Sequence, residues 1–476
     1  MPAIDPERQR NLRLEVWRLS VPAVVEMVLA SLVSIANMMM VGRLGAASIT
    51  AVGLPQQPFM FAMALVIALN VGTTAIIARS IGAGRPELAR QAFRQNWVLS
   101  GFVGLFLALV FWCLARSIVI FMGAEAEVVD LSAGYLRLMS LSIPFFTLSS
   151  TVLAALRGAG DTRSPMFITI VANSLIVILG LPLIYGLGPI PRLEVAGAGW
   201  ALLLARLYMV TASTYIAIRP QGVLRLYVRG WRLNGALLRQ TLLISLPSAA
   251  EQALLQAGLV LFIKAVAGMG TVTFAAHQIL CNIQSLSWQP AMGFAVAATT
   301  MTGQRLGAGK PDEAEYAVYQ AQNFALIIAF SMAMVFMFCG RPLLLLFTND
   351  PNIIEKSVSV LRMVAFIQPF QAIQIVQAGG LRGAGATRLP LVSTVCGIWV
   401  VRNTIAQLTL NVLHMDLIGA WIALASDQFS RYLFIQYLFK RGRWKLMEMQ
   451  LPAPGRNLKH AQAGHEVDCP AGQANG

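Results

Sequence analysis

The chain has 476 residues, of which 57% are hydrophobic and only 12% are charged, and its mean hydropathy is +0.66. Soluble domains carry about 25% charged residues, so this composition excludes an ordinary water-soluble protein. The formal net charge of +15 does not indicate a nucleic-acid partner, because the basic residues gather in short segments between long apolar runs, as in membrane proteins.

Twelve apolar runs follow one another along the chain, each long enough to cross a bilayer as a helix of about 20 residues. In the first half we predict spans over 17–41, 49–78, 95–115, 132–157, 165–187 and 196–218. In the second half we predict spans over 242–266, 274–303, 317–339, 357–381, 389–413 and 417–440. The domains expected from these spans are an N-terminal bundle (1–218), a cytoplasmic connecting loop (219–240), a C-terminal bundle (241–440) and a disordered cytoplasmic tail (441–476).

The charges between the spans indicate an orientation. Segment 79–94, after the second span, holds four arginines and one glutamate, and segment 219–239 holds five arginines and no acid. The turn over 125–130, after the third span, holds three acids instead. Since basic loops stay on the cytoplasmic side, we expect a multi-pass protein of the cell membrane with both termini in the cytoplasm.

The second half of the chain repeats the first at an offset of 225 residues. The decamer LRGAGDTRSP (156–165) returns as LRGAGATRLP (381–390), and SIGAGRPE (80–87) returns as RLGAGKPD (305–312). SVPAVVE, which ends at Glu26, likewise corresponds to SLPSAAE, which ends at Glu251. A duplicated unit with six spans places both copies in the same direction through the membrane. We therefore predict an all-α membrane fold of two parallel-repeat six-helix bundles around a central cleft, which suits transport.

These motifs resemble those of the MATE (multidrug and toxic compound extrusion) transporters of bacteria. The resemblance rests on MVGRLG (40–45), ARSIGAGRPELA (78–89), VAGMGTVTFAAHQI (266–279), GQRLGAGKPDEA (303–314) and both decamers. It implies a secondary antiporter that exports organic, often cationic, compounds in exchange for H⁺ or Na⁺ by alternating access. It also implies no ATP and no cofactor, and the sequence has no GxxxxGK[ST] phosphate loop. We expect a monomer in the lipid bilayer, with small organic substrates and no nucleic acid.

Two repeated glutamates are the main candidates for ion coupling. Glu26 in the first span and Glu251 in the seventh each follow a proline by four residues, about one helical turn. Ionisable residues at membrane depth are costly and therefore suggest function. Each carboxylate could take a proton, bind Na⁺ or pair with a substrate cation. The alternative is a structural glutamate hydrogen-bonded between helices, and the coupling role is favoured because membrane acids are usually functional.

The chain departs from the family at two acidic positions of the first half. Where many relatives carry an aspartate before MVGxLG, this sequence has Asn37. In the fifth span the family pattern keeps its first asparagine as Asn173, but the acid is replaced by Gly180. Asparagine can form hydrogen bonds but cannot titrate. Asn37 and Asn173 therefore remain candidates for ion or substrate contact, and the coupling role shifts to the two glutamates.

A second set of charges is interpreted as structural. Asp427 in the twelfth span has Arg431 four residues later on the same helical face, so a local ion pair is expected. Asp427 also aligns with Arg206 at an offset of 221, and neutralisation of a buried arginine is favoured over coupling. Arg402, in the eleventh span, needs a polar partner that the sequence does not identify.

Polar residues of the seventh and eighth spans could line a cavity. The candidates are Gln252, Gln256, His277 and Asn282. A membrane histidine can relay protons, but hydrogen-bonded packing is the favoured interpretation for His277. Trp200 and Trp421, at matched positions of the two halves, are interpreted as anchors at the membrane interface.

Two other functions were weighed against export of drug-like compounds. A flippase for lipid-linked oligosaccharides would need a large basic cavity, for which Arg206 and Arg402 are the only visible support. An intramembrane enzyme would need a nucleophile–base pair or a metal set at membrane depth. No HExxH, GxSxG or comparable cluster occurs in the sequence, so we expect neither an enzyme nor a bound metal other than Na⁺ at Glu26 or Glu251.

Overall fold

The structure is a computed structural model that describes residues 4–42, 46–122, 126–186, 192–219, 224, 234–348, 350–413, 415–447 and 449. Within these ranges the side chains of 34–39, 41, 42, 46–50, 126, 127, 267, 271 and 411 are not described. No strand occurs in these ranges, and the fold is built from helices alone.

Six long helices form the first half. They are α1 (Pro6–Gly42), α2 (Ala46–Gly82), α3 (Pro86–Phe121), α4 (Ala126–Gly158), α5 (Arg163–Tyr185) and α6 (Glu194–Ile218). The second half begins with α7 (Gly235–Ala267), α8 (Thr271–Gly307), α9 (Pro311–Phe338), the short α10 (Gly340–Leu345) and α11 (Pro351–Gly383). The chain then forms α12 (Arg388–Thr394), two π-helical segments (Val395–Arg402 and Leu408–Val412) around α13 (Asn403–Gln407), and α14 (Leu417–Lys440).

The expected all-α membrane fold is confirmed. Among the residues described, ten helices are long and apolar enough to cross a membrane. The polar-rich α8 and α14 complete the twelve spans, and the segment from α12 to Val412 is the eleventh. The eleventh span differs from its first-half equivalent α5, because it is interrupted by π-helical turns where α5 is regular.

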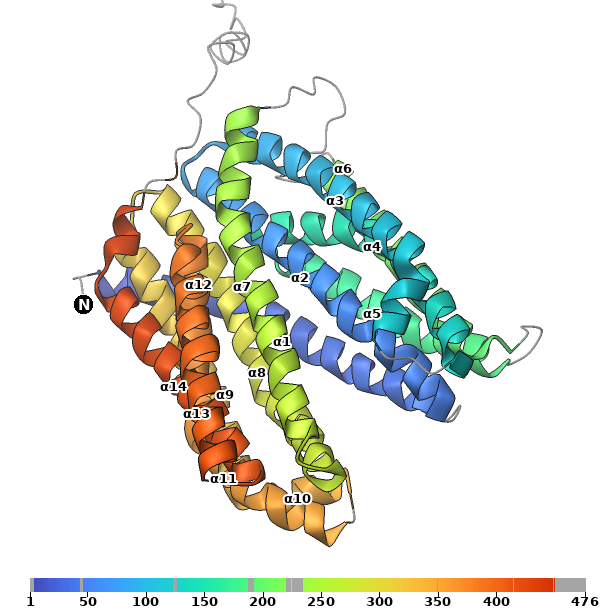
Figure 1. The fold of residues 1–476 in the computed structure, drawn as a ribbon. Helices are drawn as coiled ribbons and strands as arrows, with labels where there is room; N and C mark the ends of the chain where they lie inside the picture. The colour runs from blue at the N-terminus through green and yellow to red at the C-terminus, as the bar shows by residue number, and fades with distance from the viewer. Residues whose placement is uncertain are drawn as a thin grey trace, which may run out of the picture.

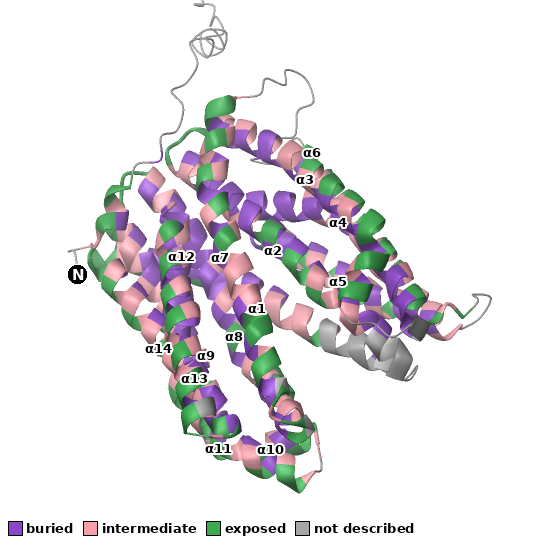
Figure 2. Ribbon diagram, in the orientation of Figure 1, coloured by how far each residue is buried: buried purple, intermediate pink, exposed green. Residues whose placement is uncertain are grey.

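The packing of the helices follows the sequence repeat. α1 packs on α5 of its own half and on α8 of the other half, and its repeat equivalent α7 packs on α12 and on α2. Within the halves, α2 packs on α4 and α8 packs on α11 in the same way. α2 and α4 bury 67% of their spanning windows, whereas α3, α5 and α6 bury only 28% of theirs, which suits contact with lipid (Figure 2).

The two halves approach each other at one end and diverge toward the other (Figure 1). At the closed end, glycines of the two repeated GAG loops allow backbones to touch. A Cβ added to Gly82 of α2 would clash with the carbonyl of Gln304, and one added to Gly307 of α8 would clash with the carbonyl of Arg79. Gly307 is the repeat equivalent of Gly82, and Gln304 is the repeat equivalent of Arg79. The crossing of α2 and α8 therefore has the twofold symmetry of the repeat.

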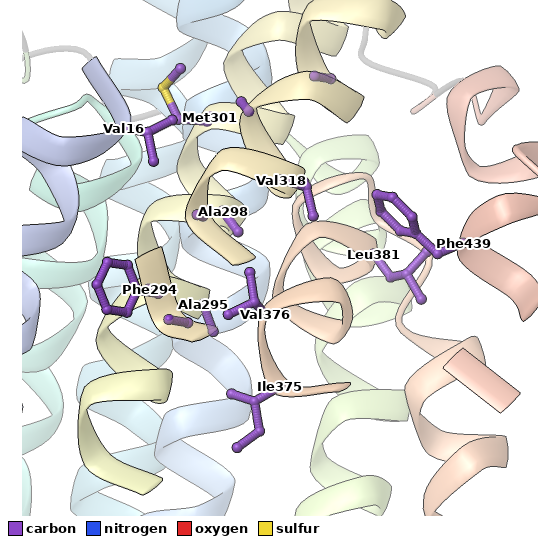
Figure 3. Close-up of a cluster of buried hydrophobic side chains, with 14 of the residues drawn as sticks. Val16, Phe294, Ala295, Ala298, Met301, Val318, Ile375, Val376, Leu381 and Phe439 are labelled. Carbon is purple, nitrogen blue, oxygen red and sulfur yellow. The ribbon is translucent and has the colours of Figure 1, made fainter. Parts of the chain in front are cut away.

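Each terminal segment packs across the boundary between the halves. Leu12 and Val16 of α1 are fully buried in the hydrophobic cluster of α8, α9 and α11, part of which is drawn in Figure 3. Arg8 also forms two hydrogen bonds to Glu313 of α9, at 3.1 and 2.8 Å. From the other end of the chain, the carbonyl of Met447 accepts a hydrogen bond from Nη2 of Arg79 on α2 at 2.8 Å. Met449 belongs to the hydrophobic cluster that joins α2, α3 and α4 to α7.

The expected disordered tail is folded in its first residues. Arg443–Leu446 form a 3-10 turn, and Trp444 is buried on Phe439 with ring centroids 4.9 Å apart. Lys445 contacts Asp312 and Glu315 at the start of α9. Residues 450–476 lie outside the described part of the chain.

Candidate functional site

Glu26 lies at the meeting point of three helices of the first half. Its side chain, on α1, is only 5% exposed. Nη2 of Arg157, at the end of α4, donates to its Oε1 at 2.5 Å, and Oγ1 of Thr169 on α5 donates to the same oxygen at 3.0 Å. The carboxylate is therefore both charge-balanced and hydrogen-bonded on one oxygen.

Glu251 occupies the equivalent place in the second half. Its side chain, on α7, is 4% exposed, and Nη2 of Arg382 at the end of α11 donates to its Oε1 at 2.6 Å. Thr394, the repeat equivalent of Thr169, is buried on α12. Glutamate and arginine are 131 residues apart in both pairs, so the two sites are copies of one another.

In each copy, the second carboxylate oxygen is not engaged by the arginine. Oε2 of Glu26 and Oε2 of Glu251 are both buried, and neither has a hydrogen-bond partner among the described residues. Buried acceptors are normally satisfied, so a pair of matched exceptions needs an explanation. A proton, Na⁺ or a substrate cation is the kind of group that such an oxygen accepts.

The arginines of these pairs come from the repeated decamers. Arginines at the ends of membrane spans usually have a topological role alone. Instead, Arg157 and Arg382 turn into their bundles, and their side chains are only 17% and 15% exposed. The decamers also form turns, in which Gly160 and Gly385 have φ of +93° and +83°, values that glycine adopts without strain.

The first of the two pairs lies beside the boundary between the halves. Oγ1 of Thr300 on α8 donates to the carbonyl of Arg157 at 3.0 Å. Nε2 of Gln304, also on α8, donates to the carbonyl of Gly158 at 3.0 Å. The end of α4 that carries Arg157 is therefore held by the opposite half.

The structural charges form one buried cluster. Asp427 on α14 binds Arg402, from the first π-helical segment, and binds Arg431 at 2.9 Å. The i,i+4 pair was predicted from the sequence, and Asp427 is also the partner that Arg402 needed. Arg206 is not part of this cluster; its guanidinium lies 4.3 Å from the centre of the Phe146 ring.

Of the expected cavity residues, His277 is the best defined. It is buried between Phe262 and Trp421, each with its ring centroid 5.6 Å from the imidazole. This environment agrees with a packing role. Trp421 is fully buried, so its interpretation as an interface anchor is wrong, whereas Trp200 is 42% exposed.

The remaining polar candidates do not gather around the glutamates in one group. Gln252 and Gln256 are half-buried on α7, and Asn282 is exposed on α8. Asn173 is half-buried on α5, and its Nδ2 has no partner among the described residues. The side chain of Asn37 lies outside the described part of the structure.

The position of the missing acid in the fifth span has an apolar neighbour. Gly180 is buried on α5, and a Cβ added there would lie 3.3 Å from Cε of Met40. No cluster of three or more His, Cys, Asp or Glu side chains that could hold a metal ion occurs in the residues that the structure describes.

Comparison with known families gives two matches in this one chain. The MatE family pattern matches residues 22–183 and again residues 247–407, with starting points 225 residues apart (247 − 22). The chain belongs to the MatE family. Each match begins at the proline that precedes a candidate glutamate and includes that glutamate, so the repeat read from the sequence is a repeat of the family unit.

Named MatE relatives cover nearly the whole chain. It is 30% identical to a "Probable multidrug resistance protein NorM" of Thermotoga maritima over 93% of this chain and 95% of the relative. It is 26% identical to "Multidrug resistance protein PmpM" of Pseudomonas aeruginosa over 84% of each.

Solved MatE structures share the fold. A transporter of the MOP superfamily from Pyrococcus furiosus matches with a TM-score of 0.85 at 25% identity, over 92% of this chain and 97% of that one. A MATE crystal structure in complex with MaD5 matches with a TM-score of 0.83 at 25% identity, over 91% of this chain and 97% of that one. The chain is thus a multi-pass membrane protein of a transporter family.

Proposed function

We propose that this chain is a multidrug efflux antiporter that exports drug-like organic compounds, often cationic, in exchange for H⁺ or Na⁺. The observation that carries the proposal is the pair of symmetric buried carboxylates, each with one oxygen bound to arginine and the other without a described partner. Membership of a transporter family and the names of the multidrug resistance relatives support the substrate class.

In the coupling step, the arginine and the coupling ion compete for the same glutamate. While Arg157 holds Glu26, or Arg382 holds Glu251, the charge of the carboxylate is already balanced. A proton or Na⁺ that binds the carboxylate weakens its attraction for the guanidinium, because unlike charges must remain for the ion pair to persist. Loading of the ion therefore frees the arginine, and loss of the ion restores the pair.

The freed arginine connects coupling to the movement of the halves. The residues around Arg157 accept hydrogen bonds from Thr300 and Gln304 of the opposite half. Opening of the ion pair would loosen this end of α4 and with it the closed end between α2 and α8. Alternating access then follows from rocking of one six-helix repeat against the other.

The arrangement of the domains and the topology are part of the same proposal. Residues 1–218 and 241–440 form the moving bundles, 219–240 links them in the cytoplasm, and 441–476 is a cytoplasmic tail. Both termini are cytoplasmic, so the closed end lies on the cytoplasmic side and access is from outside. The chain acts as a monomer, since each half already supplies the other with its packing partner.

The test is dye efflux from proteoliposomes or everted vesicles under a single imposed gradient. We expect efflux under either ΔpH or ΔNa⁺, applied separately at zero membrane potential, and the active gradient identifies the coupling ion. Efflux that continues without any ion gradient, or that requires ATP, would rule out the proposed antiport.

A flippase for lipid-linked oligosaccharides is the less supported alternative. Its basic cavity would depend on Arg206 and Arg402. Arg402 is neutralised by Asp427, and Arg206 lies against Phe146, so neither offers a free cation to a large anionic cargo.

A further inference from the structure

A small surface pocket lies where α1 crosses from the first half onto α9 of the second. It has a volume of about 380 Å³ and is lined by Arg10, Arg13, Leu14, Trp17 and Phe324. The four residues of α1 are spaced i, i+3, i+4 and i+7, so they share one face of the helix. The opposite face, with Leu12 and Val16, is buried in the second half.

The walls of this pocket combine aromatic and apolar surface with cationic groups. Trp17 and Phe324 are in ring contact at 4.9 Å, and the Arg13 guanidinium lies 5.6 Å from the centre of the Phe324 ring. Leu14 and Trp17 are 46% and 48% exposed, so apolar surface remains open beside the two cations.

The two arginines of the pocket are not neutralised by the protein that is described. Neighbouring charges of the same region are paired: Arg8 binds Glu313, and Arg305 binds Glu15 and Glu313. No salt bridge connects Arg10 or Arg13 to a carboxylate among the described residues. The pocket therefore presents two positive charges that favour an anionic ligand.

The pocket also lies at the depth where a headgroup would be found. Arg10 and Arg13 belong to the charged start of α1, which ends at Arg18, and the mainly apolar part of the helix begins at Leu19. An exposed tryptophan at this transition is typical of the membrane–water interface. On the proposed orientation, which this inference adopts, that interface is the cytoplasmic one.

We propose that the pocket binds an anionic phospholipid of the cytoplasmic leaflet. The phosphate pairs with Arg10 and Arg13, and the upper part of an acyl chain lies along Leu14 and Trp17. Basic pockets between helices on this side of a membrane bind anionic headgroups in this manner. Because Phe324 belongs to the second half and the other walls to the first, the bound lipid stabilises the packing of α1 on α9.

Lipid binding can be measured on the purified full-length protein in neutral detergent. Dioleoylphosphatidylglycerol is titrated while the bound lipids are counted by native mass spectrometry and the melting temperature is followed. We expect a saturable site that raises the melting temperature, and dioleoylphosphatidylcholine should bind at least about tenfold more weakly. Neither readout requires transport, so a failure here is separate from a failure of the proposed antiport.

The decisive variants are Arg10→Gln/Arg13→Gln and a matched control, Arg219→Gln/Arg239→Gln. The control removes two exposed arginines from the expected cytoplasmic face but outside the pocket. Each arginine near a membrane surface contributes about a fivefold gain in affinity, so the pocket variant should bind about 25-fold more weakly and the control should match wild type. Trp17→Ala should also weaken binding, because it removes the wall for the acyl chain.

Three results would overturn the proposal. Equal binding by the pocket variant and the control would place the lipid elsewhere. Equal binding of phosphatidylcholine would remove the role of charge. If inorganic phosphate raised the melting temperature as much as the lipid did, the site would be one for a free anion rather than for a phospholipid.

Discussion

Arg402, Asp427 and Arg431 show how charge is balanced inside the second bundle. One carboxylate that is completely buried holds two guanidinium groups, and Gly397 allows their approach, because a Cβ there would clash with Asp427 and Arg431. The i,i+4 pair could be predicted because helical geometry fixes that spacing. The Arg402 contact could not, since it joins residues 25 positions apart whose side chains meet only after two helices pack.

Removal of the Asp427 charge should therefore lower the stability of the protein more than removal of either arginine. Asp427→Asn leaves two buried like charges, whereas Arg431→Gln leaves the neutral pair of Arg402 and Asp427. Breaking a buried ion pair costs about 3–5 kcal/mol, and we expect a loss in this range for Asp427→Asn. For Arg431→Gln we expect a loss about half as large. Thermal unfolding in detergent measures both, and equal melting temperatures would contradict the charge balance described here.

Of the two Glu–Arg pairs, the sequence predicted the glutamates but not the arginines. The repeat identified Glu26 and Glu251, because a membrane carboxylate that occurs twice at one offset stands out from its apolar surroundings. Their partners, Arg157 and Arg382, lie in the two decamers, but an arginine at the end of a span is usually explained by topology alone, so the sequence did not identify them. The equal separation of 131 residues in both copies was the available signal for their pairing.

At the scale of helices, the crossing of α2 and α8 depends on glycine at the repeated GAG loops. These loops form tight turns, in which Gly84 and Gly309 have φ of +68° and +72°. The sequence did not predict that Gly82 and Gly307 touch the opposite half, because a contact between distant helices leaves no local pattern. The π-helical interruption of the eleventh span was also unpredicted, since its composition matches that of a regular apolar helix.

Gly82→Ala and Gly307→Ala should each weaken the closed end of the molecule. The added methyl group would overlap a backbone carbonyl, which cannot move as a flexible side chain can, so we expect about 1–3 kcal/mol of destabilisation. Gly53→Ala in α2 is the control, because a Cβ there meets nothing within 4 Å. Melting temperature is the readout. Because alanine favours a helix over glycine, the control should be at least as stable as wild type, and a control as unstable as Gly82→Ala would contradict the role given to the crossing.

At the scale of the whole molecule, the halves are joined by reciprocal exchange of their termini. The start of α1 packs on α9, and the turn after α14 returns toward the first half. The duplication and the twelve spans were predictable, since both depend on long-range periodicity in the sequence. The exchange was not, because the terminal segments are polar and carry no repeat signal.

Glu313→Gln should loosen this connection between the halves. Glu313 forms salt bridges to Arg8, Arg305 and Lys310. Nε and Nη2 of Arg8 both donate hydrogen bonds to this carboxylate, so its loss leaves these donors without their partner. We expect a lower melting temperature and a smaller dependence on salt than in wild type. Glu87→Gln, at the start of α3, is the control, since Glu87 is exposed; an identical effect of both variants would contradict the proposed role of Glu313.

The most direct test of the account is gradient-driven efflux by Glu26→Gln and Glu251→Gln in proteoliposomes. Glutamine keeps an acceptor for the arginine but cannot take a proton or balance a cation. Both variants should reach the membrane in normal amounts and bind substrate, and at least one should lose efflux driven by ΔpH or ΔNa⁺. Wild-type transport by both single variants would contradict the proposal that these two carboxylates couple the ion to export.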